Sequence, residues 1–254
     1  MWKIGVIALN TFRENLRDKI LYNLLLFAVL LLGVSVLLAD LSIMEHRKIV
    51  TDMGLAAINL AGVLIAVFVG IGLVSKEIER RTVYTIMVKP IRRTQFILGK
   101  YVGLVLTLLV NIVIMLVVYG AVLLTYNAPL HGALLQAIEL IFVELLLVTA
   151  IAMFFSTFTT TTLSAILTLG FYVIGHLSSD LKGLAQKGQS EMVKAVMTGV
   201  YYLCPNLEVL NIKGQAAIGM PASWSYQALA SLYGLAYTAL LLTAACIVFQ
   251  RRDF

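Results

Sequence analysis

Long apolar runs alternate with short polar connections along almost the whole chain. Six runs approach or exceed the roughly 20 apolar residues that a helix needs to cross a bilayer. They cover residues 21–39, 55–74, 101–124, 137–155, 163–177 and 229–249, and the fifth is the shortest. All four prolines fall outside these runs, as expected if the runs are helical spans. The pattern predicts an all-α membrane protein with six transmembrane helices.

Composition agrees with this interpretation. Hydrophobic residues make up 61% of the 254 residues and charged residues only 13%, too few to cover the surface of a soluble domain. The net charge of +6 could indicate a nucleic-acid partner. We reject nucleic acid because the basic residues lie in patches beside the spans, where they orient a chain in an anionic membrane. Membrane lipids are therefore the expected surroundings.

The distribution of basic residues predicts the orientation. With six spans, thirteen of the 19 Lys and Arg fall on the side of the two termini and six on the other side. The positive-inside rule then places both termini in the cytoplasm. We expect an integral protein of a bacterial or archaeal plasma (inner) membrane.

Residues 1–254 are expected to form a single transmembrane domain. Residues 1–19 have near-helical apolar spacing between basic residues, which predicts an amphipathic helix in the cytoplasmic interface. The alternative is a plain extension of the first span. Residues 178–225 form the one long external segment, in which we expect one or two short helices packed on the outer face.

The most distinctive segment is a charged insert between the second and third runs. Residues 75–100 hold seven of the 19 Lys and Arg. Glu77 precedes Arg80 and Arg81 by three and four residues, a spacing that supports a helix. Ile78, Thr82 and Ile86 fall on one side of that helix, and Pro90 ends it. A solvated loop is the alternative, but mixed charges and an apolar stripe favour a contact site for a soluble partner at residues 76–95.

Three motifs in and after this insert carry a family resemblance. Ser-Lys-Glu-Ile-Glu-Arg-Arg-Thr at 75–82, Val-Lys-Pro-Ile-Arg-Arg at 88–93, and Phe96 with Gly99-Lys100 resemble the signature of ABC-2 type permeases. The ending Phe-Gln-Arg-Arg-Asp-Phe is also similar to that family. The subgroup most resembled is the NosY/NatB-like one. Arg81 stands where the family often has glycine, which affects only the local start of the helix.

The resemblance implies the ABC-2 (type V exporter-like) permease fold and a permease subunit that couples ATP hydrolysis elsewhere to substrate movement, with export expected. It implies two partners: an ABC ATP-binding subunit and a second permease copy, as a homodimer or a pseudo-symmetric heterodimer. We expect no cofactor in this chain, because it has no phosphate-binding loop, so ATP-Mg would sit on the partner. The residues expected to couple the two subunits are Glu77, Ile78, Glu79, Arg80, Arg81, Thr82, Ile86, Pro90, Arg92 and Arg93.

The resemblance also suggests spans two and five as the central helices between two copies. Their small residues, Gly62, Gly70 and Gly72 in one and Ala165 and Gly170 in the other, would permit close approach. The path between the copies would then be mainly apolar and suited to an amphipathic or lipid-like cargo.

Asn59, Asn111, Glu139 and Glu144 are the polar residues within the spans that we single out as candidates. A carboxylate at membrane depth must face protein or water, and Glu144 lies deeper than Glu139. It lines a lumen or a helix contact, or it is a bonded structural residue. The two asparagines are expected to join helices.

No catalytic or metal-binding pattern is apparent. His46, His131 and His176 are predicted near the outer face without ligand spacing, and Cys204 and Cys246 have no zinc spacing. We predict no metal site and no enzyme, since no hydrolase or protease motif is present. The alternatives left open are a non-transporting membrane anchor or regulator on the same fold, and a membrane enzyme.

Overall fold

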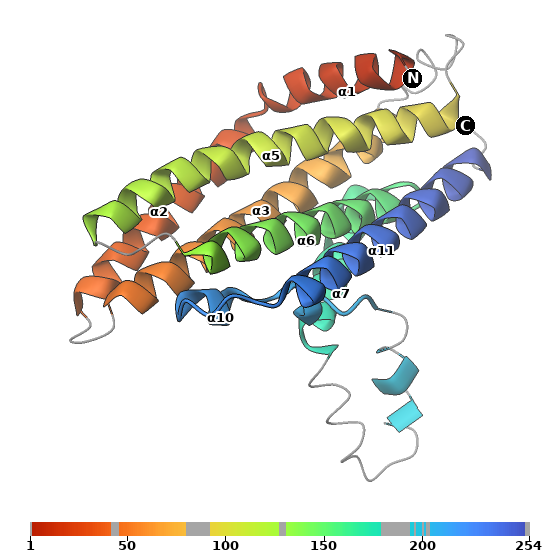
Figure 1. Ribbon diagram of the computed structural model, residues 1–254. Coiled ribbons are helices and arrows are strands. Elements are labelled where there is room, and N and C mark those ends of the chain that lie inside the picture. The colour runs from red at the N-terminus through yellow and green to blue at the C-terminus, as the bar shows by residue number, and fades with distance from the viewer. Residues whose placement is uncertain are drawn as a thin grey trace.

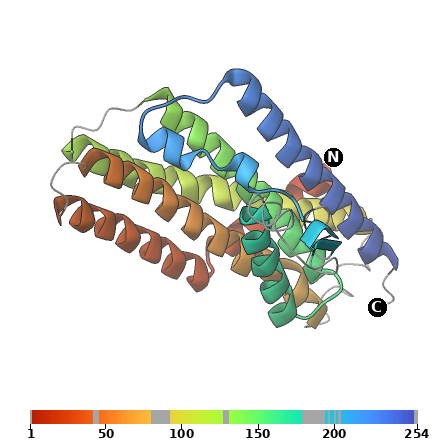
Figure 2. The same ribbon diagram turned by 90° about the horizontal axis from the view of Figure 1, so that it is seen from below.

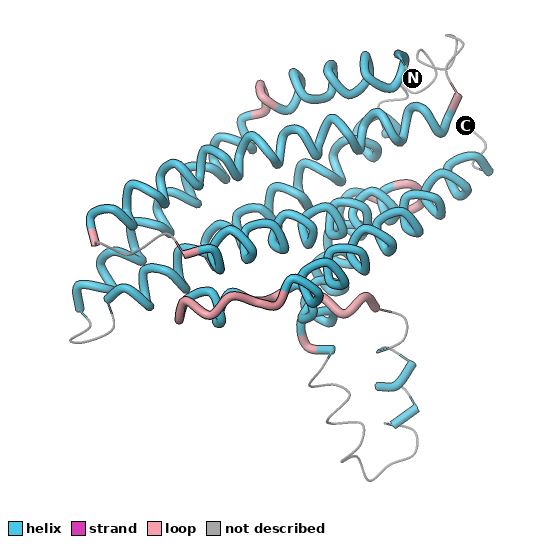
Figure 3. The backbone as a smooth tube through the Cα atoms, in the orientation of Figure 1, coloured by secondary structure: helices cyan, strands magenta, loops and turns pink. Residues whose placement is uncertain are grey.

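The structure is a computed structural model that describes residues 2–41, 46–79, 92–126, 131–178, 194–195, 197–199, 201 and 204–251. Within those residues all regular structure is helical, and short loops join the helices (Figure 3). The elements are α1 (Trp2–Asn15), α2 (Lys19–Leu41), α3 (His46–Glu79), α5 (Arg93–Thr125), α6 (Gly132–Ser156), α7 (Thr161–His176), η1 (Glu208–Leu210), α10 (Lys213–Ala217) and α11 (Trp224–Arg251).

Five helices are long and apolar enough to cross a membrane: α2, α3, α5, α6 and α11. They correspond to five of the six predicted runs. The sixth run is α7, which is apolar but has only 16 residues. At 1.5 Å per residue α7 is about 24 Å long, shorter than the roughly 30 Å hydrocarbon core. The all-helical membrane fold is therefore confirmed, whereas the count of six spans stays a prediction.

The helices run side by side as one elongated bundle, and the two chain ends lie at the same end of it (Figure 1). The starts of α5 and α7 and the ends of α3, α6 and α11 face that same end (Figure 1). The opposite end holds the start of α3, the start of α6 and the short helix α10. We call these the terminal end and the loop end of the bundle.

The core lies between α3 and α6. In their most apolar stretches 78% and 72% of the residues are buried, compared with 22% in both α2 and α11. Glycines in α3 fit against larger side chains of the neighbouring helices: a Cβ at Gly62 would lie 2.5 Å from Leu145, and one at Gly70 would lie 3.2 Å from Leu104. These two glycines thus serve packing within the chain, not the close approach of a second copy suggested by the sequence.

Helix α1 packs along the first half of α5 (Figure 1). Gly99 and Gly103, one turn apart on α5, leave room for it: an added Cβ would lie 2.7 Å from Ile7 and 2.6 Å from Thr11, respectively. The Asn15 amide donates a hydrogen bond to the Thr107 hydroxyl of α5 at 3.1 Å. A helix over 2–15 is confirmed, and its position in the membrane interface stays a prediction.

Residues 204–223 pack against the bundle. Leu207 and Leu210 are fully buried, and the Leu207 N–H donates to the Gly175 carbonyl at the end of α7. Helix α10 then packs across α3 and α6 at the loop end (Figure 2). The Gln136 side chain on α6 both donates to and accepts from the backbone of Ala222, which fixes the chain before α11. One or two short helices were expected in residues 178–225, and the described part contains η1 and α10 packed on the bundle.

Candidate functional site

The predicted coupling segment begins on a helix that continues beyond its span. Helix α3 has 34 residues and ends at Glu79, whereas its apolar stretch ends at Leu73. Its length of about 50 Å exceeds the hydrocarbon core by more than two helical turns. Glu77, Ile78 and Glu79 thus lie in the last turn of α3. Arg80, Arg81, Thr82, Ile86 and Pro90 lie outside the described residues.

Arg92 and Arg93 lie where the chain re-enters the bundle. Arg92 is the exposed N-cap of α5, and its backbone N–H donates to the Gln95 side chain at 3.3 Å. Arg93 points instead to the end of α11, where its guanidinium donates to the carbonyls of Phe249 and Gln250 at 3.2 and 3.0 Å. A cation at this position satisfies carbonyls that have no partner within their own helix and opposes the negative end of the helix dipole.

The Phe-x-x-Gly-Lys motif of α5 holds three helices together. The Phe96 ring stacks on Phe249 of α11, with 5.8 Å between the centroids and 17° between the planes. The Lys100 ammonium is buried, lies 3.5 Å from Glu14 of α1 and stands 5.9 Å from the Phe96 ring. The motif that carried the resemblance therefore joins α1, α5 and α11 at the terminal end.

Glu144 is fully buried at the middle of α6. The Asn59 amide of α3 donates to its Oε2 at 3.1 Å, and Nε2 of His176 on α7 lies 3.0 Å from its Oε1. An ionised carboxylate at this depth costs about 3 kcal/mol unless it is partnered. Here α3 supplies a hydrogen-bond donor and α7 supplies a basic group. Glu144 therefore lies at a contact between helices.

His176 connects this buried pair to the external segment. Its Nδ1 lies 3.7 Å from Oε2 of Glu208, whose side chain is 42% exposed. The Asn211 amide donates to both Glu208 oxygens at 3.2 Å. Sequence reasoning placed His176 in a surface loop and passed over Glu208. The sequence did contain one indication of these contacts: His176 lies inside the fifth apolar run, where a histidine needs a polar partner.

Glu139 and Asn111 have local partners. Glu139 on α6 accepts hydrogen bonds from Gln227 and Ser231 of α11, and the Ser231 bond is 3.0 Å long. The buried Asn111 amide donates to the Thr107 carbonyl one turn earlier on α5. The exposed Glu139 side chain thus joins α6 to α11. Asn111 was expected to join helices too, but its observed hydrogen bond stays within α5.

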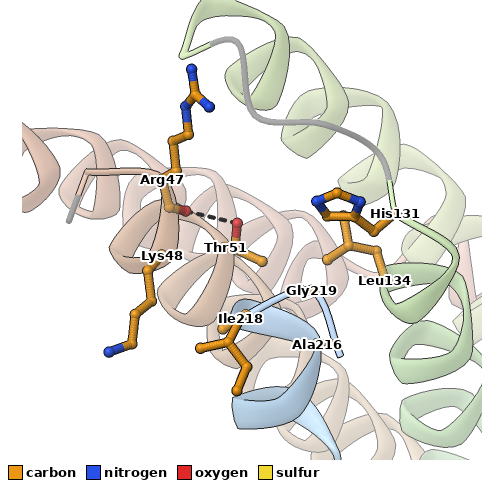
Figure 4. A pocket seen from close by; sticks show the side chains of 9 residues that line it. Arg47, Lys48, Thr51, His131, Leu134, Ala216, Ile218 and Gly219 are labelled. Atoms are coloured by element: carbon orange, nitrogen blue, oxygen red, sulfur yellow. Dashed lines mark hydrogen bonds between the residues drawn. The ribbon is translucent and has the colours of Figure 1, made fainter. Parts of the chain in front are cut away.

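A small pocket of about 230 Å³ opens at the loop end between α3, α6 and the turn after α10. Basic residues border it, namely Arg47, Lys48 and His131. Figure 4 shows the Arg47 and Lys48 side chains pointing in opposite directions, while the His131 ring stands over Gly219. The positive groups do not converge on a common point, so the pocket has no built anion site. Among the described residues no group of three His, Cys, Asp or Glu is arranged to hold a metal ion.

Comparison with known proteins gives one family. The model of the family described as "ABC-2 family transporter protein" matches residues 6–254, almost the full chain. This match confirms the resemblance that the charged insert indicated, and it leaves the NosY/NatB-like subgroup a prediction. A search of curated proteins finds no match.

Proposed function

The chain belongs to the ABC-2 transporter family, and we propose that it is driven by a separate ATP-binding subunit that docks on residues 76–95. Family membership makes it an integral membrane permease subunit of an ABC transporter and implies an ATP-binding partner. It is accordingly a transport subunit rather than a catalytic enzyme. The coupling site, the direction of transport and the pairing of two permeases are the proposed parts.

The observation that supports the coupling site is the continuation of α3 past its span. The helix passes from the apolar stretch that ends at Leu73 to Glu79 without a break. A continuous helix transmits a push or a tilt over its whole length, because its hydrogen-bond ladder is uninterrupted. Force applied to the charged residues at its end would therefore reach Asn59 and the core of the bundle.

The coupling segment, residues 76–95, is also attached to the bundle at its other end, where α5 begins. Arg93 is bonded to the last turn of α11, and Phe96 is stacked on Phe249. A partner that holds residues 76–95 would act on α3 at one end of the segment and on α5 and α11 at the other. The two glutamates and two arginines at 77–81 would meet complementary charges, with Ile78 and Ile86 in an apolar groove.

Reversal of charges tests the docking site. Glu79→Lys with Arg80→Glu should weaken co-purification with the ATP-binding subunit, or leave ATP hydrolysis without transport. Arg47→Glu with Asp52→Lys, at the other end of α3, is the matched control and should leave assembly unchanged. Full assembly and full transport in the first double variant would exclude residues 79 and 80 as coupling residues.

We further propose that the permease works as a pair, because one coupling segment addresses one ATP-binding subunit and such subunits act in twos. Export is proposed as the direction, and an amphipathic or lipid-like molecule as the cargo. ATP-dependent flux in inverted vesicles tests the transport proposal. Absence of any flux, with ATP hydrolysis intact, would favour a membrane anchor or regulator on the same fold.

A further inference from the structure

The buried Glu144 carboxylate is set in a chain of polar groups that leads outward through three elements. Its Oε2 is occupied by the Asn59 amide, and its Oε1 faces His176 Nε2 at 3.0 Å. His176 Nδ1 faces Glu208 at 3.7 Å. The exposed fraction of the side chain rises along this chain from 0% at Glu144 to 20% at His176 and 42% at Glu208. A route for protons therefore leads from a partly exposed carboxylate to one at the middle of the bundle.

We propose that Glu144 and His176 form a proton-binding site inside the membrane, which Glu208 supplies from the external side. An imidazole suits this role because it accepts a proton at one nitrogen while it gives one up at the other. Membership in the transporter family does not by itself assign such a site. The proposal therefore goes beyond the proposed function.

The transfer balances in protons and charge. Protonated Glu208 gives its proton to Nδ1 of the neutral ring, and the proton on Nε2 moves to Oε1 of Glu144. The ring ends neutral in its other tautomer, Glu208 ends ionised and Glu144 ends as a neutral acid. The 3.7 Å between Nδ1 and Glu208 is longer than a hydrogen bond. Rotation of the half-exposed Glu208 side chain or one bridging water closes it.

Among the residues that the structure describes, two tyrosines also act on this group of side chains. Tyr172, on α7, interacts electrostatically with Glu144, and its ring packs edge-on against His176. Tyr226, on α11, interacts with Glu208. Helix α3 contributes the uncharged amide of Asn59. The proton is thus shared among two carboxylates and one imidazole, with two tyrosines as neutral neighbours.

A proton fits the site better than a metal ion. Of the two Glu144 oxygens, one is already bonded to an amide N–H, which a cation would have to displace. The three candidate ligands form a line instead of surrounding a point, and the described residues contain no cluster arranged for a metal. His176 Nε2 and Glu144 Oε1 lie 3.0 Å apart, within hydrogen-bond distance, but the observed orientation makes no hydrogen bond between them, so a rotation of the ring or of the carboxylate must align the N–H before a proton is shared.

Infrared difference spectroscopy tests the site directly. The chain in lipid nanodiscs is titrated between about pH 5 and 9, the range in which an imidazole changes charge. A carbonyl band of a protonated carboxyl group in apolar surroundings should appear on acidification. Glu144→Gln should abolish that band.

Glu139→Gln is the matched control. It lies on the same helix and also accepts hydrogen bonds from side chains, but its partners Gln227 and Ser231 are an amide and a hydroxyl, which do not change charge between about pH 5 and 9. The band should survive in this variant. A band that survives Glu144→Gln or vanishes in Glu139→Gln would overturn the assignment, and so would a wild-type chain that shows no carboxyl or imidazole titration at all.

A pH jump tests the route. The band should grow on the order of tenfold more slowly in Glu208→Gln than in the wild type, while its final size is unchanged. An unchanged rate would overturn the role of Glu208. None of these measurements needs the ATP-binding subunit, so their failure leaves the proposed coupling segment standing, and failure of the docking experiment leaves the proton site standing. Circular dichroism of each variant verifies that the helices are retained.

Discussion

The Arg93 guanidinium donates a hydrogen bond to the backbone carbonyl of Phe249 across 156 positions of sequence. Arg93 is the first residue of α5, and Phe249 lies in the last turn of α11. The charged insert is thereby attached to the end of the last span as well as to α3. Both the insert and the chain ending suggested the family, and their described residues Arg93 and Phe249 are in contact at the terminal end.

Loss of this contact should destabilise the terminal end. Arg93→Gln removes charge-assisted hydrogen bonds to two carbonyls, which we expect to cost about 1–3 kcal/mol. In a chain of this size each kcal/mol corresponds to about 2–4 °C in the unfolding midpoint. A thiol-reactive dye that reports exposure of the buried Cys246 during heating in detergent measures it.

Arg92→Gln is the control for that measurement, because Arg92 is exposed and its contact to Gln95 is made by the backbone. Its midpoint should stay within about 1 °C of the wild type, as for a typical surface substitution. Equal midpoints for the two variants would show that Arg93 does not hold α11.

Replacement of Gly103 on α5 by alanine should push α1 away from α5. In Gly103→Ala the new Cβ would meet Thr11 and the Ala8 carbonyl within 3 Å, and backbone atoms cannot give way easily. We expect a loss of about 1–3 kcal/mol, as for overpacked cores. The direct measurement is the reaction rate of a cysteine at position 8, which is 3% exposed in the native chain. It should rise several-fold when Gly103→Ala is added.

Gly120→Ala provides the matched control on the same helix. No atom lies within 4 Å of the position where its Cβ would be. Alanine should therefore be accepted there, with a gain of up to about 1 kcal/mol from its better helix propensity. A fast-reacting cysteine at position 8 in both variants would mean that helix propensity, not contact with α1, determines the result.

The length of apolar runs was sufficient to predict most of the helices. Runs at 55–74 and 137–155 became the buried centres of α3 and α6, because a span is decided by local hydrophobicity alone. The length and hydrophobicity of the run at 55–74 could not predict that α3 continues to Glu79 as a helix. Continuation beyond the apolar stretch depends on polar residues, whose helix propensities differ only slightly.

The sequence alone could not predict which side chains contact the polar residues inside the spans. Glu144 and Asn59 were recognised as intramembrane polar residues, yet nothing in their spacing indicates that they meet across 85 positions. His176 was placed near the outer face because it lies at the end of the fifth apolar run, residues 163–177. In the structure the short α7 ends beside the middle of α6, so its last residue meets a buried carboxylate. Tertiary contacts of this kind are set by helix length and tilt together.

Cys204 provides a probe of the external segment. The residue is 4% exposed, and burial raises the pKa of its thiol. Because only the thiolate is alkylated, a raised pKa lowers the reactive fraction at pH 8 and moves the rise in rate to higher pH. In a Cys246→Ala background, alkylation of the native chain should be slower than that of the denatured chain by about tenfold or more. Mass spectrometry measures the rates. Equal rates at pH 8 would show that residues 204–212 do not stay packed on the bundle.

The last prediction concerns the face that a second copy covers. Outward-facing apolar residues on α3 include Leu60 and Phe68, which are 43% and 46% exposed, and α7 beside it presents Ile166 at 62%. A helix about 24 Å long would leave lipid chains mismatched if it faced the bilayer alone, and contact with another protein surface removes that cost. We therefore expect single cysteines at 60 and 166, in a chain without Cys204 and Cys246, to cross-link between two copies. Leu235 on α11 is equally exposed at 47% and should face lipid, so a cysteine there should not cross-link. Cross-linking at 235 but at neither 60 nor 166, in an active complex, would place the partner copy against α11 instead.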